Sequence, residues 1–164
     1  MNSPVHPDES WESWSARLAG DLGALTEGGW LTATTHLTPA PAAPESTPER
    51  TPRTWRRLLG RASAETPEPE CSVPEAFLQA RLLEGVLALE CIADTEFAGL
   101  SDLSDEQVAR LVGLGWEQDG DQPDLSQTFA PTDSAGAAAL LADSLREVLG
   151  AKTPSDVDLR RAAA

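Results

Sequence analysis

The stretch that decides the fold runs AFLQARLLEGVLALECIA, from Ala76 to Ala93. Two runs that suit β-strands, 76–82 and 86–93, flank the dipeptide Glu84-Gly85. Glycine supplies the positive φ that a tight hairpin turn requires. The sequence therefore predicts two neighbouring antiparallel strands.

Each predicted strand has two different faces, because successive side chains of a strand point to opposite sides. In the first strand, one row mixes aromatic, amide and cationic side chains: Phe77, Gln79 and Arg81. In the second strand, one row is wholly apolar: Leu87, Leu89, Cys91 and Ala93. We expect the apolar rows to face helices and the mixed row to face solvent.

Three amphipathic segments, 9–26, 103–115 and about 133–149, have the apolar spacing of helices. The second has the clearest local signals, since Ser104 and Gln107 are spaced as a capping box. We also expect Trp116, which follows directly, to pack in the core with its N–H on a partner.

Two more segments, 30–37 and 125–130, are predicted to be short strands. The expected order is αβ-ββαβα, in which neighbouring strands are not separated by helices. Such an order favours an α+β fold, with an antiparallel sheet of about four strands packed with three helices.

The chain is predicted to form one domain with an insertion. Residues 1–37 contribute the first helix and strand, and 75–151 complete the same domain. Residues 38–74 hold eight of the thirteen prolines and are predicted to be a disordered insertion. Residues 152–164 are predicted to be a flexible tail.

The insertion contains a basic motif around one tryptophan: Arg53, Trp55, Arg56, Arg57 and Arg61. Three interpretations remain open, namely a solubilising linker, a patch that contacts an anionic partner, and a segment that folds back on the acidic body. The rest of the chain carries the opposite charge, so fold-back competes with any external partner.

The composition limits the partners and the compartment. The chain has 27 acidic and 12 basic residues and a formal net charge of -15. This charge repels phosphate backbones and anionic lipids, so we expect no nucleic-acid partner and no stable membrane association. No apolar stretch reaches the roughly 18 residues of a membrane span, and the first residues lack the pattern of a signal peptide. We expect a cytoplasmic protein in which Cys71 and Cys91 are free thiols.

Sequence motifs give little support to catalysis. No phosphate loop, nucleophile elbow or zinc-protease motif is present. His6 and His36 are the only imidazoles, and Asp119, Asp121 and Asp124 do not match a calcium loop. We therefore predict no enzyme activity, no catalytic residue, no metal site and no cofactor.

Four phrases of the sequence carry a resemblance to a known family. They are LECIAD at 89–94, LSDEQ at 103–107, LVGLGW at 111–116 and LREVLG at 145–150. The chain resembles the TY-Chap domains, peptide-binding chaperones grouped with type III secretion chaperones and YbjN proteins. The resemblance extends from about Ala76 to Asp158 and implies a secretion-chaperone-like fold that holds peptides or partner proteins.

The sequence and the resemblance together predict a non-enzymatic, chaperone-like or adaptor domain that binds a polypeptide client. Binding is expected to use an exposed sheet face or an open sheet edge, and the acidic charge favours basic clients. The predicted contact residues are Phe77, Gln79, Arg81 and Glu90. The alternative is a structural or regulatory partner that forms a homodimer through its sheet or helices, without a transient client.

Overall fold

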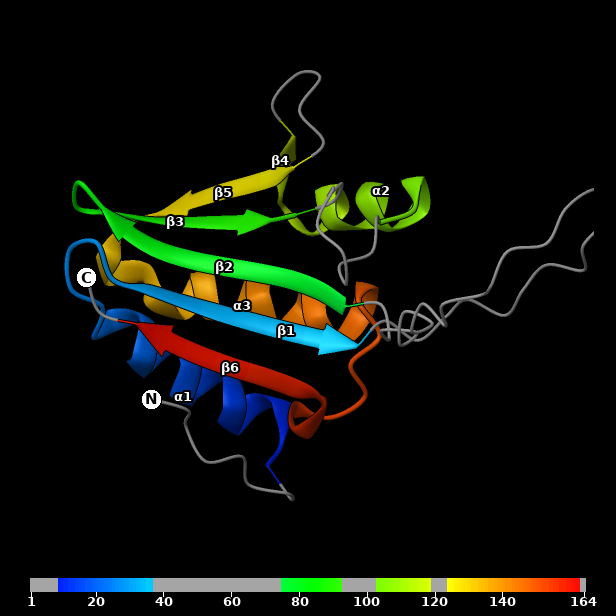
Figure 1. The fold of residues 1–164 in the computed structure, drawn as a ribbon, viewed down its shortest axis with the longest axis horizontal. Helices are drawn as coiled ribbons and strands as arrows, with labels where there is room; N and C mark the ends of the chain where they lie inside the picture. The colour runs from blue at the N-terminus through cyan, green and yellow to red at the C-terminus, as the bar shows by residue number, and fades with distance from the viewer. Residues whose placement is uncertain (1–8, 37–74, 93–102, 119–123, 163–164) are drawn as a thin grey trace, which may run out of the picture. The chain divides into compact units, whose positions relative to one another are not determined.

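Six strands form one antiparallel sheet in the computed structural model, which describes residues 9–36, 75–92, 103–118 and 124–162 (Figure 1). Their order across the sheet is β4-β5-β3-β2-β1-β6. The strands are β1 (Trp30–His36), β2 (Glu75–Leu83), β3 (Val86–Cys91), β4 (Glu117–Gln118), β5 (Leu125–Phe129) and β6 (Val157–Ala162). The α+β fold is confirmed, with six strands where the sequence predicted about four.

The hairpin of β2 and β3 forms where the sequence predicts it. Leu83 pairs with Val86 at its tip, and the two turn residues, Glu84 and Gly85, have φ values of 51° and 73°. Two consecutive positive φ values are typical of a type I′ turn, which matches the twist of the strands. The turn is also held from outside, because the carboxylate of Glu27 accepts the backbone N–H groups of both turn residues.

Three helices lie at one side of the sheet. They are α1 (Trp11–Gly23), α2 (Asp105–Leu114) and α3 (Ser134–Asp143), the last continuing as a π-helical turn, Ser144–Val148. Figure 1 shows α3 behind the central strands, α1 behind the edge strand β6, and α2 beside the end of β3. The predicted capping box of α2 is confirmed, since the Ser104 and Gln107 side chains each bond the other's backbone N–H. Gly115 ends this helix with a φ of 117°.

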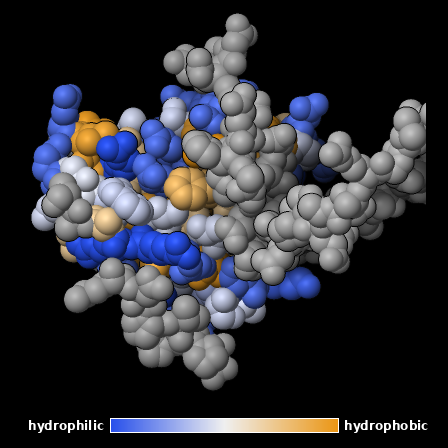
Figure 2. Space-filling model, viewed as in Figure 1, coloured by the Kyte–Doolittle hydropathy of each residue, from blue (hydrophilic) through white to orange (hydrophobic). Residues whose placement is uncertain are grey.

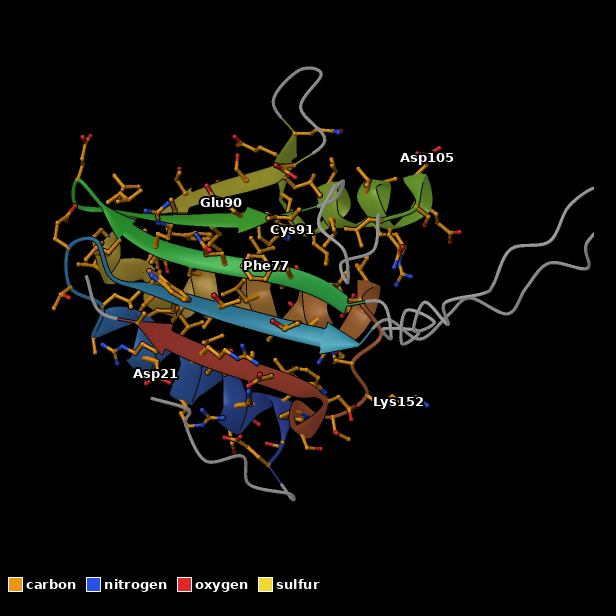
Figure 3. All side chains as sticks on the ribbon, viewed as in Figure 1. Asp21, Phe77, Glu90, Cys91, Asp105 and Lys152 are labelled. Carbon is orange, nitrogen blue, oxygen red and sulfur yellow. The ribbon has the colours of Figure 1, made fainter. Side chains whose placement is uncertain are left out.

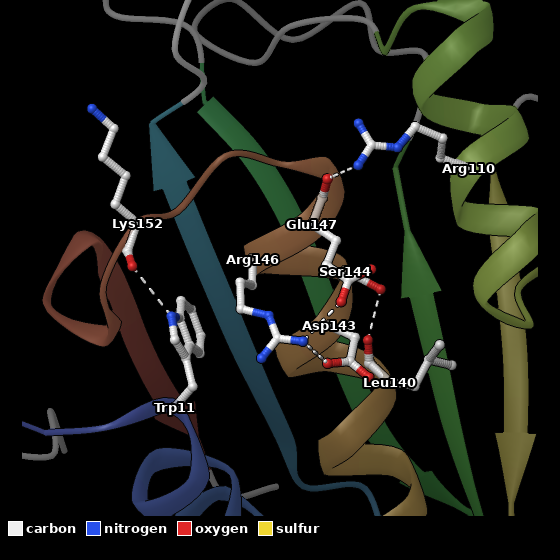
Figure 4. A network of polar contacts seen from close by, with 8 residues as sticks. All are labelled: Trp11, Arg110, Leu140, Asp143, Ser144, Arg146, Glu147 and Lys152. Atoms are coloured by element: carbon white, nitrogen blue, oxygen red, sulfur yellow. Dashed lines mark hydrogen bonds and ion pairs between the residues drawn. The ribbon is translucent and has the colours of Figure 1, made fainter.

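The core fills the space between the sheet and the helices. Leu18, Leu89, Leu111 and Leu145 are fully buried there. The predicted role of Trp116 is also confirmed, because its ring is buried and its Nε1–H donates to Ser144 Oγ at 2.8 Å. Ser144 Oγ donates in turn to the carbonyl of Leu140 at 2.7 Å (Figure 4). The core therefore leaves neither polar group unpaired.

At the other end of this layer, Trp11 is only partly buried and its indole N–H reaches the carbonyl of Lys152 at 3.3 Å (Figure 4). This bond joins the start of α1 to the loop that precedes β6.

The prediction of a flexible tail at 152–164 is wrong for most of its length. Asp156 caps a short 3₁₀ turn there, and the Thr153 backbone N–H, with further bonds from Thr153 and Lys152, lowers the pKa of its carboxyl. β6 then pairs with β1 from Val157 to Ala162. Val157 and Leu159 are buried and alternate with exposed charged residues, so this strand gains a buried face that a free tail would lack.

The strand β4 is also additional to the sequence prediction. It has two residues, which pair with the first two residues of β5. The predicted insertion at 38–74 lies outside the described residues.

Candidate functional site: the open face of the sheet

One face of the sheet is covered by helices, and the opposite face is covered by no described helix (Figure 3). We call the second surface the open face. The pairing places one row of side chains across its centre: Thr32 of β1, Gln79 of β2, Glu90 of β3 and Ser126 of β5. The intervening residues of the same strands, such as Ala80 and Leu89, are fully buried toward the helices.

All four contact residues predicted from the sequence lie on the open face. Phe77, Gln79 and Arg81 follow one another along β2 and are half-buried, and Glu90 is exposed on β3. Gln79 lies opposite Glu90, and its Nε2 donates to Glu90 Oε2 at 3.4 Å. Figure 3 places Phe77 near the middle of the sheet. The structure thus brings these residues together, and their role in binding stays a prediction.

The hairpin end of the open face carries an apolar cluster that the sequence analysis did not identify. It consists of Trp30, Leu83 and Val86, whose exposed fractions are 36%, 38% and 40%. Leu83 lies opposite Val86. Trp30 lies opposite Arg81, which is the neighbour of Leu83 on the same face of β2. Figure 2 shows apolar side chains at this end of the sheet among hydrophilic ones. The sequence does contain the information that places Trp30 on this face. Trp30, Thr32 and Thr34 are alternate residues of one strand, so their side chains point to the same side of the sheet.

Hydrogen-bonding and charged groups surround the apolar side chains of the open face. The Nε of Arg81 is buried and has no hydrogen-bond partner among the described residues. On β6, Arg160 pairs with Asp158 at 2.8 Å. Thr34 and Thr128 supply further hydroxyl groups on the same face. The surface therefore combines apolar contact area with donors and acceptors, as binding surfaces for polypeptides do.

The cysteine among the described residues, Cys91, is a free and buried thiol. Burial raises the pKa of the Cys91 thiol to about 12, with a smaller contribution from the charge of Asp124. This thiol stays protonated near neutral pH and is not an activated nucleophile. Within the described ranges, no group of three His, Cys, Asp or Glu side chains is placed to hold a metal ion.

A shallow groove lies on the helix side, between the end of α2, β5 and α3. Its volume is about 360 Å³, and Leu114, Phe129, Leu140 and Asp143 contribute to its walls. The Asp143 carboxylate already pairs with Arg146 at 3.0 Å (Figure 4). The groove thus presents mainly apolar walls and no free reactive group.

Several candidate residues lie outside the described part of the chain. They are His6, the basic motif (Arg53, Trp55, Arg56, Arg57 and Arg61), and Asp119 and Asp121 of the acidic turn. Within the described residues, no helix is both long enough and apolar enough to cross a bilayer.

Comparison with known proteins identifies the family. A family model described as "T3SS (YopN, CesT) and YbjN peptide-binding chaperone 3" matches residues 63–163. No curated protein and no solved structure matches the chain. The match includes β2 through β6 and all of α2 and α3. Since it covers more than half of the sequence, the chain belongs to the TY-Chap3 family of peptide-binding chaperones.

Proposed function

We propose that the protein binds an extended polypeptide segment of a client on the open face, without catalysing a reaction. The observation that carries this proposal is the half-buried Phe77 together with the exposed cluster of Trp30, Leu83 and Val86 on a face that no described helix covers. Membership of a peptide-binding chaperone family supports the same function. Exposed apolar side chains that gather on one surface and are rimmed by polar groups are typical of interaction sites.

The open face offers two kinds of contact to a client. Apolar client side chains would pack on Phe77 and on the cluster at the hairpin end, and tryptophan is enriched among the residues that dominate binding energy. Gln79 and Glu90 would meet the polar groups of the client, since an amide side chain both donates and accepts hydrogen bonds. The formal charge of -15 attracts basic segments over longer distances.

The direct test uses peptides selected from a random library for binding to the wild-type protein. Phe77→Ala is expected to weaken their affinity tenfold or more, because it removes the central apolar contact (about 1.4 kcal/mol or more). Val112→Ala is the matched control: Val112 is also an exposed large apolar residue, at 46%, but lies on α2. Its affinity should stay within about twofold of wild type.

A second test locates the bound peptide. A photo-crosslinking amino acid at Gln79 is expected to capture the selected peptide, whereas the same amino acid at Ala16, an exposed position of α1, should not. Unchanged affinity of Phe77→Ala, with crosslinks only from α1, would show that another surface binds the client.

A further inference from the structure

Arg81 and Arg160 are both cations of the open face, and they differ in their partners. Arg160 of β6 pairs with Asp158 at 2.8 Å. Among the described residues, no carboxylate forms an ion pair with Arg81. Its Nε is also buried without a hydrogen-bond partner. Buried donors nearly always have a partner in folded proteins, so an unpaired one calls for an explanation.

The register of the sheet explains why Arg81 lacks a partner. Its neighbours directly across the sheet are Trp30 of β1 and Ala88 of β3. The indole of tryptophan donates but does not accept hydrogen bonds, and alanine has no polar side-chain atom. Glu90 lies two residues along β3 from Ala88, opposite Gln79, and its carboxylate accepts the Gln79 amide at 3.4 Å. Since Arg81 is only half-buried, part of its side chain contacts solvent and can reach a ligand.

We propose that Arg81 binds the side-chain carboxylate of one Asp or Glu residue of the client and thereby determines which clients bind. This inference rests on the function proposed above. The planar guanidinium holds its N–H donors in a fixed arrangement that matches the two oxygens of a carboxylate. Partial burial strengthens such a charge-assisted bond, because less water screens the two charges.

The charge around Arg81 favours a carboxylate over a phosphate group. Glu90, Glu117 and Asp158 lie on the same face of the sheet. The whole chain has a formal net charge of -15. A phosphorylated side chain brings nearly two negative charges, so it meets more repulsion than a carboxylate does. The same repulsion disfavours clients with several acidic residues, so we expect one acid in an otherwise basic or apolar segment.

The apolar cluster predicts which kind of residue lies near this acid. Leu83 lies two positions beyond Arg81 on β2, and Val86 lies opposite Leu83. In an extended client, alternate side chains point to the same side, with about 6.6 Å between residues i and i+2. Arg81 and Leu83 have the same spacing, because both belong to one strand. In a client that lies along β2, a large apolar residue two positions from the acid should therefore contact the cluster.

The first test compares peptides selected from a random library on the wild-type protein and on Arg81→Met. This variant keeps an apolar stem and removes the charge. On the wild-type protein, we expect Asp or Glu to be enriched at one position, with a large apolar residue two positions away. Arg81→Met should lose the acidic enrichment. Arg160→Met is the matched control and should retain it, since Arg160 lies on the same face but already has a carboxylate partner.

The second test measures the preference with synthetic peptides. A selected peptide is amidated at its C-terminus, and the enriched acid is either Glu or its uncharged isostere Gln. The wild-type protein should bind the Glu peptide about tenfold more tightly than the Gln peptide. Arg81→Met should bind both equally, and Arg81→Glu should instead prefer a peptide with Lys at this position. Circular dichroism checks that each variant is folded, and a reversed preference does not arise from partial unfolding.

Three results would overturn the inference. They are equal binding of the Glu and Gln peptides to the wild-type protein, an equal loss for both peptides in Arg81→Met, and replacement of the side-chain acid by a free C-terminal carboxylate without loss of affinity. The second would assign Arg81 to the main chain of the client, and the third to its terminus. The proposed function would still stand if Phe77→Ala weakened both peptides. Binding that does not depend on Phe77, with crosslinks only from α1, would contradict the proposed function and this inference with it.

Discussion

The two faces of the β2–β3 hairpin come from the same eighteen-residue stretch, yet one face packs against the helices and the other is covered by no described helix. On the covered face, Leu78, Ala80 and Leu89 have exposed fractions of 1% or less. On the open face, the alternate residues Gln79 and Glu90 remain partly or fully exposed and bond each other. Apolar burial drives folding in proportion to the area removed from water, so the covered face contributes most of the stability. The open face contributes less, because several of its side chains keep contact with water.

The largest expected effect comes from breaking the covered face. Leu89→Ala removes a fully buried side chain from the middle of β3. It should lower the free energy of unfolding by about 2 to 5 kcal/mol, because a cavity adds to the lost transfer free energy. Urea denaturation followed by circular dichroism measures the change.

The matched control is the next residue along the strand. Glu90→Ala changes the exposed face at the same depth in the sheet, and surface substitutions change stability by about 0.5 kcal/mol or less. Equal losses for the two variants would show that the open face is also buried, and would contradict the assignment of the two faces.

A smaller effect is expected from a polar group within the covered layer. Ser144→Ala removes the hydroxyl that accepts the N–H of the buried Trp116. An unpaired buried donor costs about 1 to 3 kcal/mol, so the variant should unfold at lower urea concentration. Trp116→Phe tests the cause, because the serine deletion should cost less once the indole N–H is absent. A serine deletion that costs the same in both backgrounds would exclude the hydrogen bond as its origin.

The Cys91 thiol, which lies on the covered face, should also be shielded from solvent. Cys91 has its pKa raised from 9.0 to about 12 by burial, so the folded protein keeps this proton while the unfolded chain loses it above pH 9. The contribution of this thiol to the free energy of unfolding is complete below pH 9 and is lost as the pH rises from about 9 toward 12. At pH 10 the free energy of unfolding should be lower by about 1 kcal/mol. Comparison with Cys91→Ala across this range isolates the contribution.

Thiol labelling at neutral pH sharpens the same contrast. In a Cys71→Ser background, Cys91 should react slowly with a thiol reagent, since it is buried and protonated. Glu90→Cys, with Cys91→Ala, moves the thiol by one residue to the open face and should react at the rate of an exposed thiol. Rapid labelling of Cys91 in the folded protein would contradict the burial of this row.

The sequence predicted the parts of the fold that local signals determine. The Glu84-Gly85 turn sets the hairpin, and the capping box of Ser104 and Gln107 sets the start of α2. Alternation within the hairpin was sufficient to place Phe77 and Arg81 on one face. Each of these inferences uses residues a few positions apart, where backbone preference and side-chain spacing are most informative.

Long-range pairing explains what the sequence prediction missed. β6 pairs Ala162 with Trp30, more than a hundred positions away, and its six residues include three charges. Only the alternation of Val157 and Leu159 with charged residues indicated a strand. Trp30 begins the strand predicted at 30–37, and the sequence does not show whether its ring is buried. Its exposure depends on its neighbours across the sheet, which the sequence alone does not give.

A small change in stability is expected from the residue with the largest expected role in binding. Phe77 is only half-buried, so Phe77→Ala should lower the free energy of unfolding by about 1 kcal/mol, below the loss for Leu89→Ala. The same variant should lose tenfold or more in affinity for selected peptides. Urea denaturation and peptide titration on one preparation give both numbers. A loss of stability as large as that of Leu89→Ala would place Phe77 in the core, and its effect on binding would then follow from unfolding rather than from a lost contact.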